Sequence, residues 1–190
     1  MVEESGRPRD PRIDAAVLSA TVELLAETGY PGLLVSAIAG RAGTSKPAIY
    51  RRWASKAHLV HEAVFPISAS TEIPDTGSLR QDLREMVCRT RDVLSTPAAR
   101  AALPGLIGEM AADPTLHSAL LERFAGLIGG GLHDLLAKAA ARGEVRSDVT
   151  AAELAEAVAG VTLLGLLTRV ELDDTWIDRT TTLLLRGIGA

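Results

Sequence analysis

Apolar residues recur three and four positions apart along most of the chain, a spacing that places side chains on one face of an α-helix. Near the N-terminus, Ile13, Val17, Ala20 and Leu24 follow this spacing until Gly29 ends it. Alternating β-branched runs are scarce, and prolines, glycines and capping residues separate the apolar segments. The pattern predicts an all-α protein, with helices expected at residues 10–29, 46–53, 55–64, 78–94, 96–110, 113–142, 150–165 and 176–188.

Local signals mark several helix boundaries in the C-terminal two thirds of the chain. Ser78 with Gln81, and Thr150 with Glu153, have the spacing of a capping box, in which two side chains satisfy backbone N–H groups at a helix start. The Pro-Gly pair at 104–105 predicts a kink or an interruption in its helix.

Residues 37–56 contain two short helical patterns around a tight turn. Gly43 can adopt the left-handed conformation that ends a helix, and Ser45 stands where an N-cap side chain is wanted. Ile49 and Trp53 are four residues apart and should face the core. These features are typical of a helix-turn-helix, whose second helix leaves its outer face free for a DNA major groove. The side chains expected on that outer face are those of Lys46, Pro47, Ala48, Tyr50 and Arg51.

Charge is distributed unevenly along the chain. Residues 1–65 hold eight Lys and Arg against seven Asp and Glu, a net charge of +1, whereas residues 66–190 hold twelve against seventeen, a net charge of −5. A basic surface suits the displacement of counterions from a duplex, and an ordinary solvated face is the alternative. Tyr50 has an alternative too, as a half-buried core aromatic. Between Glu27 and Glu62 no acidic residue opposes Arg41, Lys46, Arg51, Arg52 and Lys56.

The same stretch carries a recurrent pattern of residues: Ile38-Ala39, Ala42-Gly43, Ser45-Lys46, Ile49-Tyr50, Trp53, Ser55-Lys56 and Leu59. This pattern closely resembles the DNA-binding domain of the TetR (tetracycline-repressor) family of transcriptional regulators, over roughly residues 13–62. The resemblance implies a three-helix helix-turn-helix head on an all-helical body that binds a small molecule and dimerises. It also implies that Lys56 faces a phosphate and that the DNA-facing positions are Thr44, Ser45, Lys46, Pro47, Ala48, Tyr50 and Arg51.

Two residues depart from the family pattern. Leu34 stands where the family usually has a Thr or Ser that caps a helix and often touches phosphate, so the sequence lacks that contact. Pro47 replaces a more usual small residue and gives the second helix a stiffer start with fewer donors. Neither departure changes the expected fold.

The chain is long enough for a small head and a larger body. We expect a disordered arm at residues 1–9, a helix-turn-helix DNA-binding domain at 10–54, and a ligand-binding and dimerisation domain at 55–190. The arm could alternatively touch DNA through its arginines. No apolar run approaches the roughly 20 residues of a membrane span, and the start does not have the pattern of a secretory leader. A cytoplasmic protein is therefore expected.

The middle helices of the body are expected to hold a small apolar or amphipathic effector, because the candidate lining residues carry no charge. The glycines at 129–131 are costly in a helix, at about 1 kcal/mol each relative to Ala. They fit either a thin wall beside a ligand or close helix packing without one. The candidate lining consists of Met86, Leu103, Leu106, Ile107, Met110, Phe124 and Ile128.

The last two helices are unusually apolar, and small residues on the first of them permit close approach. A four-helix contact between two copies explains this composition, so we expect a homodimer formed through these helices. An ordinary monomer core is the alternative. The leucines concerned are Leu163, Leu167, Leu183, Leu184 and Leu185.

Enzymatic chemistry finds little support in the sequence. The four histidines and Cys88 do not fall in a metal-ligand spacing, so neither a metal nor a cofactor is expected. Cys88 could be a redox-sensing thiol or a small packing residue. The sequence predicts a transcriptional regulator, a ligand-responsive repressor that binds a palindromic double-stranded DNA operator as a homodimer. A helical small-molecule-binding enzyme is the alternative.

Overall fold

The computed structural model describes residues 11–66 and 73–189, apart from the side chains of residue 121 and residues 123–129. The expected arm at 1–9 and residue 10, where the first helix is expected to begin, lie outside the described residues. Within those ranges the chain consists of helices and loops without a β-strand, which confirms the all-α prediction. The helices are α1 (Pro11–Gly32), α2 (Val35–Arg41), α3 (Lys46–Tyr50), α4 (Lys56–Val64), α6 (Leu79–Ser95), α7 (Pro97–Ala112), α8 (Pro114–Ala141), α9 (Ala151–Leu167) and α10 (Asp174–Ile188).

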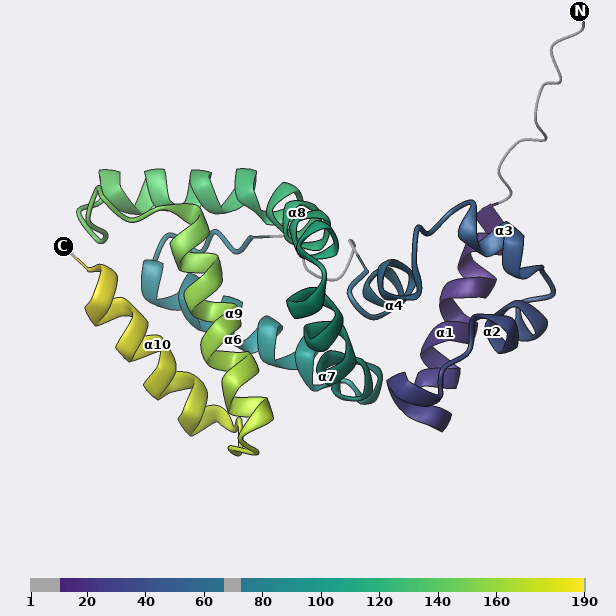
Figure 1. The fold of residues 1–190 in the computed structure, drawn as a ribbon. Helices are drawn as coiled ribbons and strands as arrows, with labels where there is room; N and C mark the ends of the chain where they lie inside the picture. The colour runs from purple at the N-terminus through teal and green to yellow at the C-terminus, as the bar shows by residue number, and fades with distance from the viewer. Residues whose placement is uncertain (1–10, 67–72, 190) are drawn as a thin grey trace, which may run out of the picture.

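Helices α1 to α4 form the head at one end of the molecule (Figure 1). Helix α1 packs against α2 and α4, and Val17 and Leu25 are fully buried on its inner face. Ile38 and Leu59 are also fully buried. The periodic apolar residues of α1, α2, α3 and α4 therefore share one core, as their spacing predicts.

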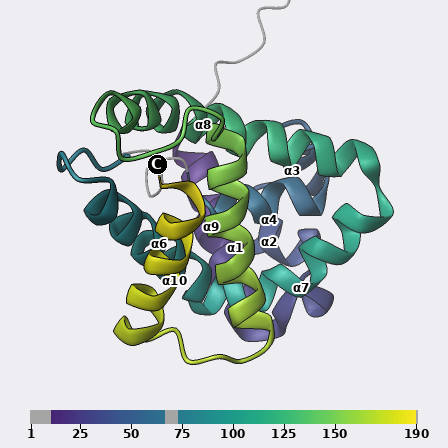
Figure 2. The same cartoon turned by 90° about the vertical axis from the view of Figure 1, so that its left-hand side faces the viewer.

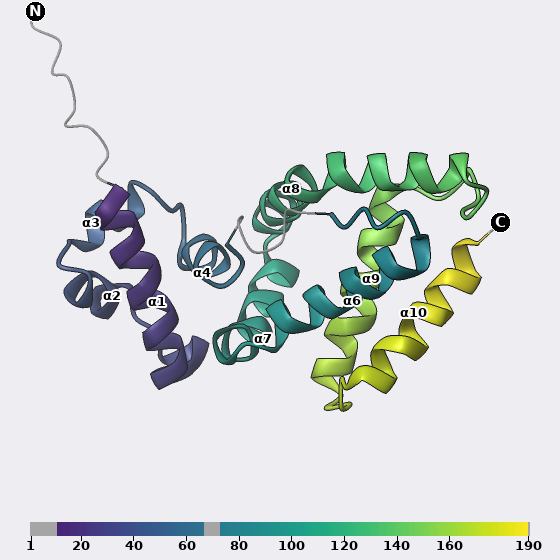
Figure 3. The same ribbon diagram turned by 180° about the vertical axis from the view of Figure 1, so that it is seen from behind.

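Helices α6 to α10 form the body. Helix α6 packs against both α9 and α10, and α8 runs across one end of these helices (Figures 1 and 3). A second core lies among them, with Leu83, Leu132, Leu154 and Ile177 almost fully buried. Helices α9 and α10 lie on the side of the body turned away from the head (Figure 2). None of the helices in the described ranges is long and apolar enough to span a bilayer.

The head and the body meet through α7. Helix α7 packs against α1 and α4, and its contact with α1 is the most extensive of the interhelical contacts described. The core of the head continues into this helix, where Ala99, Ala102 and Leu106 are buried. One apolar cluster therefore spans the junction between head and body.

Two details of the helices differ from the prediction. Helix α3 ends at Tyr50 rather than near Trp53, because the Arg52 N–H donates to the Ile49 carbonyl, three residues back, and so leaves the four-residue helical pattern. Helix α7 runs through Pro104 without an interruption, so the other alternative at the Pro-Gly pair, a kink, stays a prediction. Trp53 keeps its predicted place in the core although it lies outside the helix.

The predicted capping boxes have different outcomes. Thr150 and Glu153 form one, with the Glu153 N–H donating to Thr150 Oγ1 at 3.2 Å and the Thr150 N–H donating to the Glu153 carboxylate at 2.9 Å. Ser78 makes no side-chain cap at the start of α6. The Leu79 N–H donates instead to Glu144 Oε2 at 2.9 Å, so a residue distant in sequence replaces the local cap.

Gly131 lies where α8 meets the segment before α6. A Cβ added at Gly131 would lie 2.7 Å from Cγ1 of Ile73, whereas one added at Gly130 would meet no atom within 4 Å. Gly131 is thus closely packed against Ile73, and a thin wall beside a ligand stays a prediction for the glycine run.

Candidate nucleic-acid interface

The turn before α3 positions this helix through local backbone geometry. Gly43 has a φ of +64°, a left-handed conformation that glycine adopts without strain from a Cβ. Ser45 Oγ accepts a hydrogen bond from the Ala48 N–H at 3.3 Å. Pro47 lies in the first turn, where its missing N–H leaves no helical hydrogen bond unmade. The predicted turn and N-cap are both confirmed.

The inner and outer faces of this region separate clearly. Ile49 and Trp53 are 1% and 5% exposed, as expected for core residues. Tyr50 is 43% exposed and belongs to neither apolar core, so it is not the core aromatic of the alternative interpretation. The exposed members of the predicted DNA-facing set are Ser45, Lys46, Pro47, Tyr50 and Arg51, and Thr44 is half-buried.

Ala48 is the exception in this set, because it is buried rather than outward-facing. Its methyl group extends only one bond from the backbone, and Arg52 folds back over this turn to donate from Nη1 to the Ala48 carbonyl at 3.3 Å. The prediction of an outward Ala48 is therefore wrong.

Two of the basic residues that have no acidic neighbour in sequence acquire one in the fold. Arg41 donates to both carboxylate oxygens of Glu27, at 2.6 and 3.0 Å. Arg52 forms an ion pair with Asp14. The Arg41 guanidinium hydrogen-bonds the Glu27 carboxylate and lowers the pKa of Glu27 below its ordinary value. Because both carboxylates belong to α1, this helix neutralises part of the basic stretch, an effect that proximity in sequence does not reveal.

Lys56 is held by the head itself. Its Nζ donates to the Tyr30 carbonyl at 3.2 Å and lies 4.1 Å from the centroid of the Tyr30 ring. The ammonium thus has both a hydrogen-bond acceptor and a cation–π partner. Its contact with a DNA phosphate stays a prediction.

Lys46 and Arg51 are the basic residues that the fold leaves on the outer side of α3. Lys46 Nζ lies 5.8 Å from the centroid of the Tyr50 ring. Neither Lys46 nor Arg51 pairs with a carboxylate belonging to residues 11–66 or 73–189. The outer side of α3 therefore presents two cations and a phenol, groups that donate hydrogen bonds to phosphates and base edges.

Leu34 occupies the N-cap position of α2 without a side-chain hydrogen bond, and it is 61% exposed. A Thr or Ser there would offer a hydroxyl. The leucine leaves an apolar group at the edge of the head, which agrees with the departure read from the sequence.

Comparison with known proteins places this geometry in a family. Residues 17–63 match the family model "Bacterial regulatory proteins, tetR family", and residues 73–184 match "Tetracyclin repressor-like, C-terminal domain". The chain belongs to the TetR family of transcriptional regulators. The resemblance read from residues 13–62 is thus confirmed, and the match extends through the body.

Individual relatives of this TetR-family regulator agree with the assignment. The DNA-binding transcriptional repressor TetR of Mycobacteroides abscessus is 35% identical over 169 residues, which cover 87% of each chain. An uncharacterized HTH-type transcriptional regulator of Mycobacterium tuberculosis is 32% identical over 162 residues, 81% of this chain and 78% of that protein. The TetR family transcription regulator SCO0332, whose crystal structure is known, has 30% sequence identity to this chain. The two structures match with a TM-score of 0.68 over 93% of this chain and 98% of that one. The protein is therefore a DNA-binding transcriptional regulator with a helix-turn-helix head.

The predicted effector-lining residues lie in two separate parts of the TetR-type body. Leu103 and Leu106 are buried in the core that joins α7 to the head. Met86 packs against the other core, among α6, α8, α9 and α10. Ile107 and Met110 pack against the first of these cores. Phe124 and Ile128 lie outside the residues whose side chains are described. The effector lining therefore stays a prediction.

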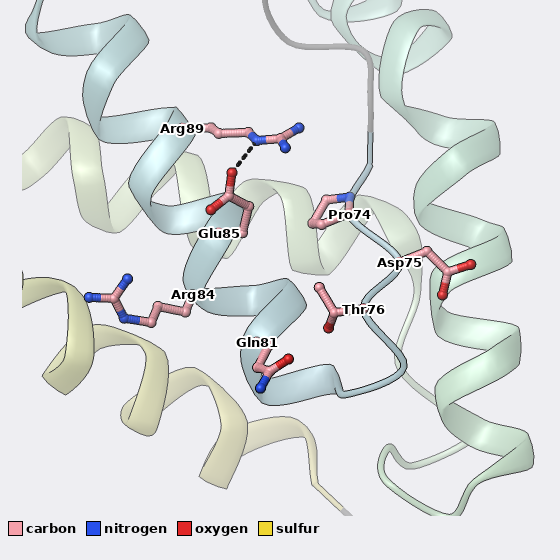
Figure 4. A pocket seen from close by; sticks show the side chains of 7 residues that line it. All are labelled: Pro74, Asp75, Thr76, Gln81, Arg84, Glu85 and Arg89. Carbon is pink, nitrogen blue, oxygen red and sulfur yellow. Dashed lines mark hydrogen bonds and ion pairs between the residues drawn. The ribbon is translucent and has the colours of Figure 1, made fainter.

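A pocket of about 460 Å³ opens beside the first turns of α6 (Figure 4). Its lining combines charged, polar and apolar groups, and Arg89 Nε donates to Glu85 at 2.7 Å, one turn away on the same helix α6. None of the predicted effector-lining residues belongs to this pocket. The lining residues are Pro74, Asp75, Thr76, Gln81, Arg84, Glu85 and Arg89.

Proposed function

We propose that this TetR-family regulator is a ligand-responsive repressor that binds a palindromic operator as a homodimer. The observation that carries the proposal is the outer side of α3, where Lys46 and Arg51 are exposed without a carboxylate partner among the described residues. Each can donate to guanine O6 and N7 or to a phosphate oxygen. Tyr50 beside them can donate to a phosphate.

Replacing Lys46 and Arg51 together by alanine tests this reading surface. With a duplex selected from a random-sequence pool by the wild-type protein, we expect the double variant to lose specific binding. If residual binding is measurable, its plot of log K against log salt should be shallower by about 1 to 2, because each lost phosphate contact removes about 0.9 from the slope. Fluorescence anisotropy over a series of salt concentrations measures both quantities.

A charge-matched control separates recognition from net charge. Arg80 and Arg100 are exposed on α6 and α7, away from α3, and their replacement by alanine removes the same charge. This control should retain binding. Equal affinity of both double variants would contradict the assignment of the reading surface.

Dimerisation through the last two helices is supported by their exposed leucines. Leu164 and Leu167 on α9 are 61% and 51% exposed, and Leu183 on α10 is 67% exposed. Of the predicted leucine set, Leu167 and Leu183 are thus exposed, whereas Leu163, Leu184 and Leu185 are half-buried against the cores. A two-fold pair would also present two α3 helices to two half-sites.

The effector is proposed to act on α7, because this helix carries four of the predicted lining residues and also touches α1 and α4. A small apolar or amphipathic molecule that favours one position of α7 would shift the population of head arrangements. Native mass spectrometry of the purified chain, followed by organic extraction, tests for such a molecule. An extracted compound should release the selected duplex when it is added back, and a compound that binds without changing DNA affinity would contradict its role as effector.

A further inference from the structure

Tyr30 lies at the point where the end of α1 meets both α4 and α7. Gly29 before it has φ +66° and ψ 174°, which breaks the helical path and redirects the last turn of α1. The Tyr30 side chain is only 5% exposed. In Figures 1 and 3 this end of α1 lies beside α7, in agreement with the extensive packing of the two helices. The redirected turn thus buries a large aromatic ring at the boundary between head and body.

The ring fits against α7 only because residue 105 is a glycine. A Cβ built on Gly105 would lie 2.1 Å from Cδ1 of Tyr30, 2.5 Å from Cγ and 2.7 Å from Cε1. Contacts shorter than 3.0 Å essentially do not occur for Cβ atoms, and all three atoms belong to a rigid ring near its attachment. Alanine at this position would therefore force the ring, and the turn that carries it, away from α7.

One polar contact connects the same residue to α4: Lys56 donates to the Tyr30 carbonyl and lies over the ring. On the α7 side, the phenol oxygen is buried without a hydrogen-bond partner among the described residues. Burial, with the Glu109 carboxylate as a further cause, raises the pKa of this phenol. Tyr30 therefore joins the end of α1 to the first residue of α4 and to the body helix α7.

We propose that Tyr30 is a positioning residue that transmits displacements of α7 to the DNA-binding head, helices α1 to α4. The Tyr30 ring occupies the space that the missing side chain of Gly105 leaves on α7, which we call the Gly105 notch. A shift of α7 would therefore move the ring, and the ring would move the last turn of α1 and Lys56. The inference rests on the proposed function, because it assumes that the orientation of the head sets DNA affinity. It adds the contact through which the body controls that orientation.

Two glycines of α7 allow a test of whether the fit of the Tyr30 ring against Gly105 matters for DNA binding. Gly105→Ala introduces the clash, whereas Gly108→Ala is a matched control, because a Cβ at Gly108 would meet no atom within 4 Å. Both changes are combined with Tyr30→Leu, which removes the ring and makes room for the new Cβ. The resulting cycle compares the effect of alanine at 105 with and without the ring, so a general effect of the substitution on the helix cancels.

The first readout is the affinity of the full-length proteins for the selected duplex. In the presence of Tyr30, Gly105→Ala should change the apparent Kd about fivefold or more relative to Gly108→Ala, because Kd scales inversely with the fraction of molecules whose head is oriented for binding. In the Tyr30→Leu background the two alanine variants should agree within about twofold, the usual error of such cycles. An equal ratio in both backgrounds, or a ratio within about twofold throughout, would overturn the proposal.

A second readout does not depend on DNA. In a Trp176→Phe background, Trp53 is the remaining tryptophan and reports the head, whereas far-ultraviolet circular dichroism reports mainly the body helices. With urea, the two signals should coincide for Gly108→Ala and separate for Gly105→Ala, with the head unfolding first. If the wild-type protein binds no duplex, the proposed function fails, and this comparison still decides the role of Tyr30: coincident transitions for Gly105→Ala would overturn it.

Discussion

Truncating Leu183 to alanine should weaken self-association of the chain without unfolding it. Leu183 is 67% exposed on α10 and Leu164 is 61% exposed on α9. Neither side chain is needed to fill the core, since the buried positions of α10 are those of Ile177, Thr180 and Thr181. The substitution therefore acts on the surface that two copies are proposed to share.

The expected loss of dimerisation free energy follows from the apolar area of Leu183 that is exposed in one copy and would be buried in the dimer. Leu→Ala removes three carbon groups worth about 0.8 kcal/mol each when fully buried, and about two thirds of this gain remains available at an exposed fraction of 67%. That gives about 1.5 kcal/mol for each copy. In a two-fold contact the residue occurs twice, so the loss is about 3 kcal/mol, or roughly a 100-fold weaker dimer.

Sedimentation velocity over a range of protein concentrations measures this dissociation constant, and circular dichroism checks the fold. Leu34→Ala is the matched control, because Leu34 is similarly exposed, at 61%, but belongs to the head. It should leave the dimer unchanged. If Leu183→Ala and Leu34→Ala dissociate at the same concentration as the wild type, the α9 and α10 face is not the dimer contact.

Three further predictions concern stability and are measured by urea denaturation. Thr150→Ala should lower the free energy of unfolding by about 1 kcal/mol because it removes a capping box, whereas Ser78→Ala should cost little because that hydroxyl caps nothing; equal losses would refute this difference. Gly130→Ala should stabilise α8 by up to about 1 kcal/mol, and Gly131→Ala should fall short of that gain because its Cβ meets a side chain; equal gains would contradict the close packing. The pKa of Glu144 lies below its ordinary value of 4.5. The ionised carboxylate therefore contributes fully to the free energy of unfolding above pH 4.5, and this contribution is lost as the pH falls through the lowered pKa. Glu144→Gln should therefore be less stable than the wild type near pH 7 and approach it at low pH, and a difference independent of pH would refute this assignment.

Features set by neighbouring residues could be predicted from the sequence. The turn at Gly43, the cap at Ser45 and the inward pair Ile49 and Trp53 depend on spacings of a few residues, and all are as predicted. The all-α class follows from the same periodicity. The helix-turn-helix and most of its exposed face therefore follow from the order of amino acids alone.

Features that join distant segments could not be predicted in this way. Glu27 lies 14 residues from Arg41, and Glu144 lies 65 residues from Leu79. Neither pairing follows from helical periodicity, so a stretch that looks uniformly basic carries fewer available cations than its sequence indicates. The seat of Tyr30 on α7 is of the same kind, because it depends on how two helices cross and not on either sequence alone.

The ion pairs of Arg41 with Glu27 and of Arg52 with Asp14 have a consequence for how the protein searches a genome. Within residues 11–66 these two pairs leave fewer cations free to displace counterions, so we expect this part of the head to bind unrelated DNA more weakly. Long residence then requires a site whose bases complement the outer side of α3. The internal pairs thus favour discrimination between sites over indiscriminate retention on the chromosome.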